Sequence, residues 1–177
     1  MSKMRLATVW LDGCSGCHMS FLDLDDRLLA VAEKADLVYS PLVDCKDFPL
    51  DVDIALVEGA VSSDEDLHKI QIVRERSKTL VSLGDCAVTA NVPSMRNQFP
   101  LRTILDRAYQ ENVTLDPGTP TIAVPALLEK VRPVHEVVPV DVFIPGCPPS
   151  ADTIFYAVSE LLEGRSPDLG PKTHFGS

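Results

Sequence analysis

The sequence has no apolar run that approaches the roughly 20 residues needed to cross a bilayer as a helix. Its first ten residues also lack the apolar core and the small-residue cleavage pattern of a secretory signal, and they contain no twin-arginine pair. These absences exclude the usual signatures of export and membrane insertion. We therefore expect a cytoplasmic protein with no membrane association.

Positive charge is also scarce. Only 16 lysine and arginine residues stand against 26 acidic ones, which gives a formal net charge of −10. Such a surface is repelled by phosphate backbones and by anionic lipid, so we expect no nucleic-acid partner. With 177 residues, 45% of them hydrophobic, the chain suits a single domain over residues 1–177.

Short apolar runs alternate with amphipathic stretches along the chain. Five runs rich in β-branched residues end at turn residues and predict strands, at Arg5–Trp10, Leu37–Ser40, Ile54–Glu58, Leu80–Leu83 and Asp141–Ile144. Their near-continuous apolarity is typical of strands that are covered on both faces. Together with the intervening helices, they predict an α/β fold with a doubly wound parallel sheet of about five strands.

Helices are expected between these strands. Ser63 is a suitable N-cap for a helix with an apolar stripe, and Ser150 opens another helix that Gly164 is placed to end. A third helix is expected from about residue 17 to residue 34. Residues 112–140 carry five prolines and predict an irregular excursion over the surface, with one short helix at 125–131.

The chain has five cysteines, an odd number that cannot all pair as disulfides within the chain. In the reducing cytoplasm, clustered cysteines are more often metal ligands or redox thiols. Four of them follow predicted strands, and the carboxyl ends of parallel strands share one edge of the sheet, so their side chains should converge there. These motif cysteines are Cys14, Cys17, Cys86 and Cys147.

Four converging thiolates suit an iron–sulfur cluster. A glycine lies one or two residues before each motif cysteine, which lets backbone N–H groups approach the sulfurs closely. Structural zinc is an alternative, although its sites usually carry two C-x₂-C pairs and only one is present here. A thioredoxin-like redox pair accounts for Cys14 and Cys17 but leaves the other two unexplained.

Other polar residues near these motifs have two readings each. For Cys45 we favour a free structural cysteine over a fifth thiol at the site. Glu58 either lies near the cluster or faces a partner and relays protons, or it is a loop carboxylate satisfied by backbone N–H groups. His18 either bonds a cluster sulfur or, as we favour, is a partly exposed structural histidine. Arg96 and Asn97 are expected to fix a loop or contact a partner.

Four motifs, taken in order, resemble the small subunit of cytoplasmic nickel–iron hydrogenases, above all the NAD-reducing, bidirectional type: WLDGCSGCHMSFLDLD, VEGAV, GDCAVTANVPSMRN and PGCPPS. The resemblance covers nearly the whole chain and implies a flavodoxin-like fold. It also implies one proximal 4Fe–4S cluster on the four motif cysteines and a nickel–iron site on a separate large subunit. Further implied partners are ferredoxin-like and flavin-containing diaphorase subunits that reduce NAD, and no catalytic site is expected on this chain.

Two departures from related families refine this expectation. The similar subunit of the quinone-reducing respiratory complex has two adjacent cysteines, whereas Ser15 and Gly16 separate them here. Membrane-bound and periplasmic small subunits continue into a domain with two further clusters, whereas no cysteine follows Cys147, so we expect one cluster. The predicted function is an electron relay in a hydrogenase. The alternatives are an iron–sulfur subunit of a quinone-reducing complex or of another cytoplasmic hydrogenase type, and a flavin-binding module at the switch point of the sheet.

Overall fold

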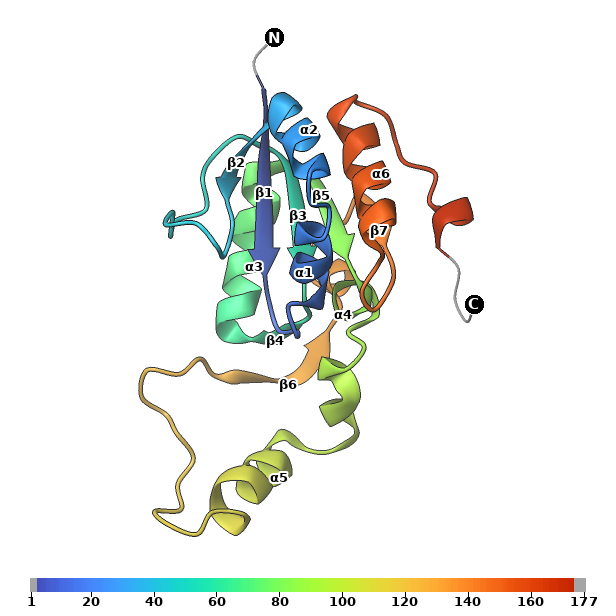
Figure 1. Ribbon diagram of the computed structural model, residues 1–177. Coiled ribbons are helices and arrows are strands. Elements are labelled where there is room, and N and C mark those ends of the chain that lie inside the picture. Colours follow the sequence, from blue (N-terminus) through green and yellow to red (C-terminus); the bar gives the residue numbers. More distant parts are fainter. Residues whose placement is uncertain (1–2, 174–177) are drawn as a thin grey trace.

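The computed structural model describes residues 3–173, so the ends of the predicted domain, 1–2 and 174–177, lie outside the described residues. At its centre is a parallel sheet of five strands in the order β2-β1-β3-β5-β7 (Figure 1). The strands are β1 (Met4–Trp10), β2 (Ala35–Tyr39), β3 (Val52–Glu58), β5 (Ser77–Leu83) and β7 (Val142–Ile144). This is the flavodoxin-like strand order, so the predicted fold is confirmed.

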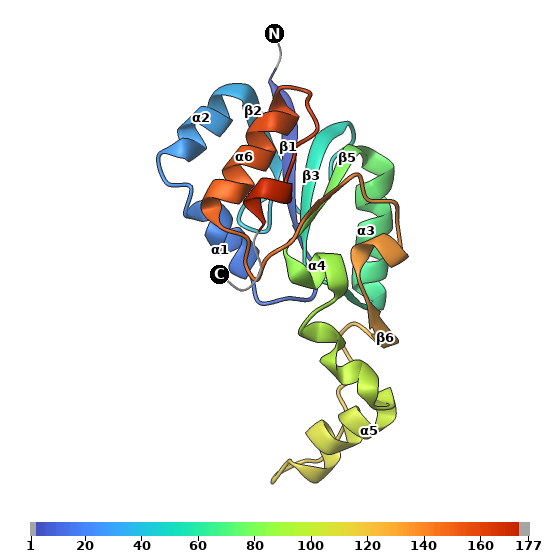
Figure 2. The ribbon, with the colours of Figure 1, turned by 90° about the vertical axis from the view of Figure 1, so that its right-hand side faces the viewer.

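Helices cover both faces of the sheet, as Figure 2 shows. The helices α1 (Gly16–Leu22), α2 (Arg27–Lys34) and α6 (Ala151–Leu162) lie on one face, and α3 (Asp64–Arg76) and α4 (Asp85–Thr89) lie on the other. Two separate clusters of buried side chains follow from this arrangement, one on each face of the sheet. The central strand β3 contributes to both clusters, which explains its continuous apolar sequence.

The two helices predicted from their N-caps are present. Ser63 Oγ accepts a hydrogen bond from the Asp66 N–H at 3.1 Å, and the Asp66 carboxylate accepts one from the Ser63 N–H at 3.0 Å. This reciprocal pair is a capping box that starts α3. At the start of α6, Ser150 Oγ accepts from the Thr153 N–H at 3.2 Å. Gly164, with φ +72°, follows the end of that helix.

Two local predictions are wrong. The helix expected over 17–34 is broken between α1 and α2, where Asp25 has a φ of +50°. Phe21 at the end of α1 and Leu24 in the turn after it are both buried in the same core, which fixes the turn against the sheet. The helix expected at 125–131 is instead strand β6 (Leu127–Arg132), because it pairs antiparallel with β4 (Val61–Ser63), a partner far away in the sequence.

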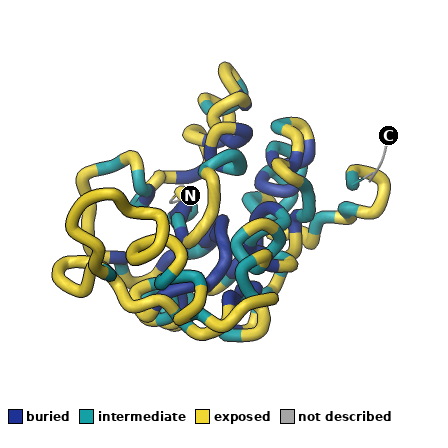
Figure 3. The backbone as a smooth tube through the Cα atoms, turned by 90° about the horizontal axis from the view of Figure 1, so that it is seen from below, coloured by how far each residue is buried: buried dark blue, intermediate teal, exposed yellow. Residues whose placement is uncertain are grey.

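A segment between α4 and β6 stands away from the sheet. After η1 (Pro93–Gln98), the chain forms α5 (Leu101–Asp106) and the π-helical η2 (Arg107–Glu111), and then returns to β6 through 112–126. Residues 99–127, which we call the arm, project beyond the carboxyl edge of the sheet (Figures 1 and 2). Most of the arm is exposed, in keeping with the exposed tube seen from that side (Figure 3).

Two short 3-10 helices complete the chain, η3 (Val134–Glu136) and η4 (Gly170–Lys172). Within residues 3–173, none of the helices combines the length and the apolarity that a bilayer span requires.

Candidate metal centre

The carboxyl edge of the sheet holds a small cavity to which all four motif cysteines contribute. Cys14 and Cys17 follow β1, Cys86 lies in α4 after β5, and Cys147 follows β7. The cavity has a volume of about 120 Å³, roughly that of four water molecules. Thiols that are up to 133 residues apart in the sequence thus face one space, as the edge argument predicts.

The thiols differ in exposure. Cys14 and Cys147 are exposed, whereas Cys17 and Cys86 are half-buried. All are free, as is Cys45, which is exposed on the loop between β2 and β3 and donates from its Sγ to the Asp47 carbonyl at 3.2 Å. The cavity therefore has a buried side toward the sheet and an open side toward solvent.

The electrostatics of the cavity oppose free thiolates. Burial raises the pKa of Cys17 far above its usual range, and the charges of Glu58 and of the other three motif cysteines raise it further. Burial, with Cys14 and Cys147, also raises the pKa of Cys86, against a hydrogen bond from the Val92 backbone. The described residues that line the cavity include no lysine or arginine. Cationic metal at this position would supply the missing positive charge.

Glycines leave room for the sulfurs. Gly84 has a φ of +80°, and a Cβ added there would lie 2.1 Å from the Sγ of Cys17. A Cβ at Gly16 would approach the Sγ of Cys14 to 3.3 Å. Only glycine fits at position 84, for both its backbone conformation and the adjacent sulfur.

Hydrogen bonds tie the cysteine-bearing loops to one another. The Asp85 N–H donates to the Gly146 carbonyl at 2.8 Å, and the Gly146 N–H donates to the Asp85 carboxylate at 2.7 Å. Ser20 Oγ in α1 donates to the Pro149 carbonyl at 2.6 Å. The loops after β1, β5 and β7 therefore hold one another in place, and the spacing of the thiols depends on all of them.

Glu58 lies at the carboxyl end of β3 and lines the same cavity. It is 2% exposed and accepts hydrogen bonds from the His18 backbone N–H at 2.6 Å and from Trp10 Nε1 at 3.1 Å. The His18 ring Nδ1 lies 2.6 Å from the same carboxylate oxygen as the N–H. The carboxylate is therefore both satisfied by a backbone N–H, as one reading expected, and placed at the cavity, as the other expected.

His18 is 5% exposed, so the expectation of a partly exposed histidine is wrong. The carboxylate of Glu58 draws its ring inward, and the ring packs 5.4 Å from that of Trp10. Within the described residues, Nε2 of His18 has no hydrogen-bond partner. The sequence analysis did not single out Trp10 as a site residue. The available signal was that Trp10 and Glu58 each end a predicted strand, and the structure pairs them across β1 and β3.

The residues that line the cavity limit which metal group could bind there. Across residues 3–173, no three or more His, Cys, Asp or Glu side chains are arranged around a point where one metal ion could bind. The four thiols instead surround a space of about 120 Å³. Four thiols are the donor set of a 4Fe–4S cluster and of a structural zinc ion alike, so the chemistry of the lining fits either group.

Fold and site together define a class, a flavodoxin-like α/β protein whose sheet edge presents four free thiols to one cavity. The chain belongs to the family described as NADH ubiquinone oxidoreductase, 20 Kd subunit, whose model matches residues 14–161.

Individual relatives narrow this placement. The NAD-reducing hydrogenase HoxS subunit delta of Cupriavidus necator is 45% identical over 172 residues, covering 94% of this chain and 82% of the relative. A subunit of the crystal structure of an NAD+-reducing [NiFe]-hydrogenase in the H2-reduced state matches with a TM-score of 0.93 and 41% identity, over 98% of this chain and 99% of that one. The predicted kinship with small subunits of NAD-reducing nickel–iron hydrogenases is confirmed.

More distant relatives are longer than this chain. The sulfhydrogenase 2 subunit delta of Pyrococcus furiosus is 31% identical over 164 residues, and the match spans 93% of this chain but 64% of the relative. The [NiFeSe]-hydrogenase of Dm. baculatum matches with a TM-score of 0.61 at 18% identity, over 97% of this chain and 69% of that one, which supports the fold alone.

Proposed function

We propose that this chain is the electron-transfer small subunit of an NAD-reducing nickel–iron hydrogenase, and that Cys14, Cys17, Cys86 and Cys147 hold its one 4Fe–4S cluster. The observation that carries the proposal is the meeting of these four thiols, from loops after three different strands, in one cavity. When bound, such a cluster supplies a one-electron carrier whose potential depends on the charges and hydrogen bonds around it.

The size of the cavity helps to separate the proposal from its alternatives. At about 120 Å³, it lies well below the roughly 300 Å³ at which sites for organic ligands begin, which disfavours a flavin there. The chain has one C-x₂-C pair, Cys14 and Cys17, which disfavours a structural zinc ion, because structural zinc sites usually carry two such pairs.

The open side of the cavity indicates where electrons enter and leave. Cys14 and Cys147 are exposed, so a partner can approach the site at that edge. In this proposal the partner is the large subunit that activates H2, and ferredoxin-like and flavin-containing diaphorase subunits carry electrons on to NAD in the cytoplasm. The chain itself holds no reacting substrate. Its residues position the thiols, shield Cys17 partly from water and set the charge beside it.

Metal analysis tests the proposal directly. Purified without oxygen, the chain is expected to contain about four irons with matching acid-labile sulfide and no zinc. Cys86→Ala removes one of the four thiols and should lose most of this iron, whereas Cys45→Ser, at an exposed thiol outside the cavity, should keep it. Full iron retention in Cys86→Ala, or stoichiometric zinc in the unaltered chain, contradicts the proposal.

The physiological context needs a second measurement. Anaerobic purification of the native complex through a tag on this chain should recover a nickel-containing subunit and a flavoprotein. Hydrogen-dependent reduction of NAD by that complex supports the assigned acceptor. Recovery with a quinone-reducing membrane complex instead would favour the alternative raised by the family as a whole.

A further inference from the structure

The arm, residues 99–127, exposes apolar side chains that an isolated protein would normally bury. Leu115 is 82% exposed and Ile122 is 88% exposed, and Phe99 and Val124 are also exposed. Among the described residues, η1, α5 and η2 contribute no buried side chain. An exposed apolar segment of this size, standing apart from the core, marks a contact surface.

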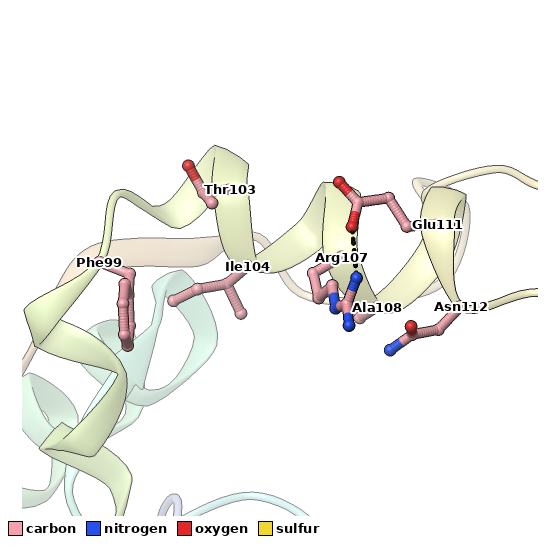
Figure 4. Close-up of a pocket in the computed structure, with 7 residues that line it drawn as sticks. All are labelled: Phe99, Thr103, Ile104, Arg107, Ala108, Glu111 and Asn112. Carbon is pink, nitrogen blue, oxygen red and sulfur yellow. Dashed lines mark hydrogen bonds and ion pairs between the residues drawn. The ribbon is translucent and has the colours of Figure 1, made fainter.

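Two hollows follow the helical part of the arm. The first has a volume of about 400 Å³ and lies along α5 and η2, where Figure 4 shows the ring of Phe99 close to the side chain of Ile104. The second, of about 550 Å³, lies between the helices and the returning chain, with Leu105 and Val124 in its lining. Each hollow is large enough to take apolar side chains of a partner.

The charges of the side chains that line the two hollows indicate which kind of partner fits them. In the first hollow, the charged side chains are Arg107 and Glu111, which pair with each other at 2.8 Å (Figure 4). The residues that line the second hollow are all uncharged. In a chain with a net charge of −10, such a neutral surface fits an apolar protein segment and offers nothing to a nucleic acid or an anionic lipid.

Exposed apolar residues also lie near the cysteines in the sequence. Met19 in α1, two residues after Cys17, is exposed, and so are Val92 and Met95, which lie in the sequence between Cys86 and the arm. The arm projects beyond the same edge of the sheet that holds the cysteine cavity (Figures 1 and 2), so a partner that covers the open side of the cavity lies beside the arm.

The base of the arm is fixed before any partner arrives. The side-chain amide of Asn97 donates to the Val131 carbonyl and accepts from the Val131 N–H, both at 2.8 Å. Arg96 donates to the carbonyls of Leu128 and Ser62 at 2.8 and 3.2 Å. A fixed base lowers the ordering entropy that docking would otherwise cost.

We infer that the arm is a docking element for the nickel-containing large subunit, which seats an apolar segment in the two hollows while it covers the cysteine edge. This inference rests on the proposed function for the identity of the partner. It assigns a role to residues 99–127 that lies outside the cysteine site.

Site-specific crosslinking in the native complex tests the assignment. A photoreactive phenylalanine analogue in place of Ile122 should crosslink to the large subunit, identified by mass spectrometry. The same analogue at Leu29, 69% exposed on α2, is the control and should not give that product. A crosslink from position 122 to a second copy of this chain, or to a diaphorase subunit, overturns the inference.

Substitution gives an independent readout. Val124→Asp combined with Ile104→Asp should lower recovery of the large subunit with the tagged chain by about tenfold or more, whereas Leu29→Asp should leave it unchanged. The isolated double variant should retain its full iron content, because neither position lines the cysteine cavity. Undiminished recovery of the large subunit overturns the inference, while missing iron in the unaltered chain contradicts the proposed function instead.

Discussion

The carboxylate of Glu58 lies 2.6 Å from both the backbone N–H and the ring Nδ1 of His18, the residue that follows the ligand candidate Cys17. Both side chains are buried, and the carboxylate also lines the cysteine cavity. A single side chain thus fixes the start of α1 and places a negative charge beside the thiols.

Removal of this carboxylate should destabilise the protein. Glu58→Ala leaves the His18 N–H and Trp10 Nε1 without their acceptor in a buried place, and we expect a loss of about 3 kcal/mol in the free energy of unfolding. Glu58→Gln keeps an acceptor oxygen and should lose less than half of that. Urea denaturation of the metal-free proteins measures both values. Equal stability of the alanine variant and the parent would disprove the structural role.

The same carboxylate should influence the thiols through its charge. After burial, Glu58 is the largest cause of the raised pKa of Cys17, so Glu58→Gln should lower that pKa. The rate of alkylation of the metal-free protein, followed against pH, should then rise at lower pH than in the parent. In the metal-loaded protein, less negative charge at this position should move the reduction potential to more positive values. A shift in the opposite direction would contradict this assignment.

Gly84→Ala should abolish metal binding. The new methyl group would lie 2.1 Å from the Sγ of Cys17, at a residue whose φ of +80° already disfavours alanine. We expect a loss of about 2 kcal/mol or more in stability, and iron content near zero after anaerobic reconstitution. Gly164→Ala is the matched control, because its φ is +72° but no atom lies within 4 Å of the added Cβ. That variant should show only the backbone strain and keep its iron.

Asn97→Ala should loosen the base of the arm. The substitution leaves the N–H and carbonyl of the buried Val131 unpaired, which should cost about 1–3 kcal/mol. Limited proteolysis should cleave the arm faster than in the parent, while iron content stays the same. Substitution of the exposed Asn112, which lies beyond η2, is a suitable control and should leave the cleavage rate unchanged.

The stabilising effect of Asp53 should depend on pH. Partial burial works against it, but hydrogen bonds from Lys78 and from the Arg5 N–H, both at 2.7 Å, hold the pKa of Asp53 below its usual value. A carboxyl group with a lowered folded-state pKa stabilises the protein above its unfolded pKa of about 3.9, and this contribution disappears as the pH falls through the folded value. Asp53→Asn should therefore be less stable than the parent near neutral pH, and the difference should shrink in acid. A difference that grows on acidification would refute this.

Much of the fold could be predicted because local signals agreed with the tertiary structure. The strands of the sheet are apolar on both sides, and the capping residue Ser63 marks the start of α3 in the sequence as clearly as in the structure. The convergence of the motif cysteines followed from topology alone, since each comes after a strand of one parallel sheet.

Other features depend on contacts that no local pattern records. β6 exists because β4 lies beside it, and Leu127 meets Ser63 across 64 residues of chain. The burial of His18 depends on Glu58, 40 residues later, and on Trp10 opposite it. Short apolar stretches show the same pattern in a helix and in a buried strand, so periodicity predicted a helix at 125–131 where the structure has β6.

The negative net charge of the chain and the exposed apolar residues of the arm affect how the chain behaves before it meets any partner. The exposed apolar residues of the arm would by themselves favour self-association of the chain. The negative net charge opposes it, because like-charged copies repel one another. Salt shortens the reach of that repulsion, to about 8 Å at physiological ionic strength. Chains that have not yet bound a partner are therefore kept from aggregating by their net charge, and the repulsion between them weakens as the salt concentration rises.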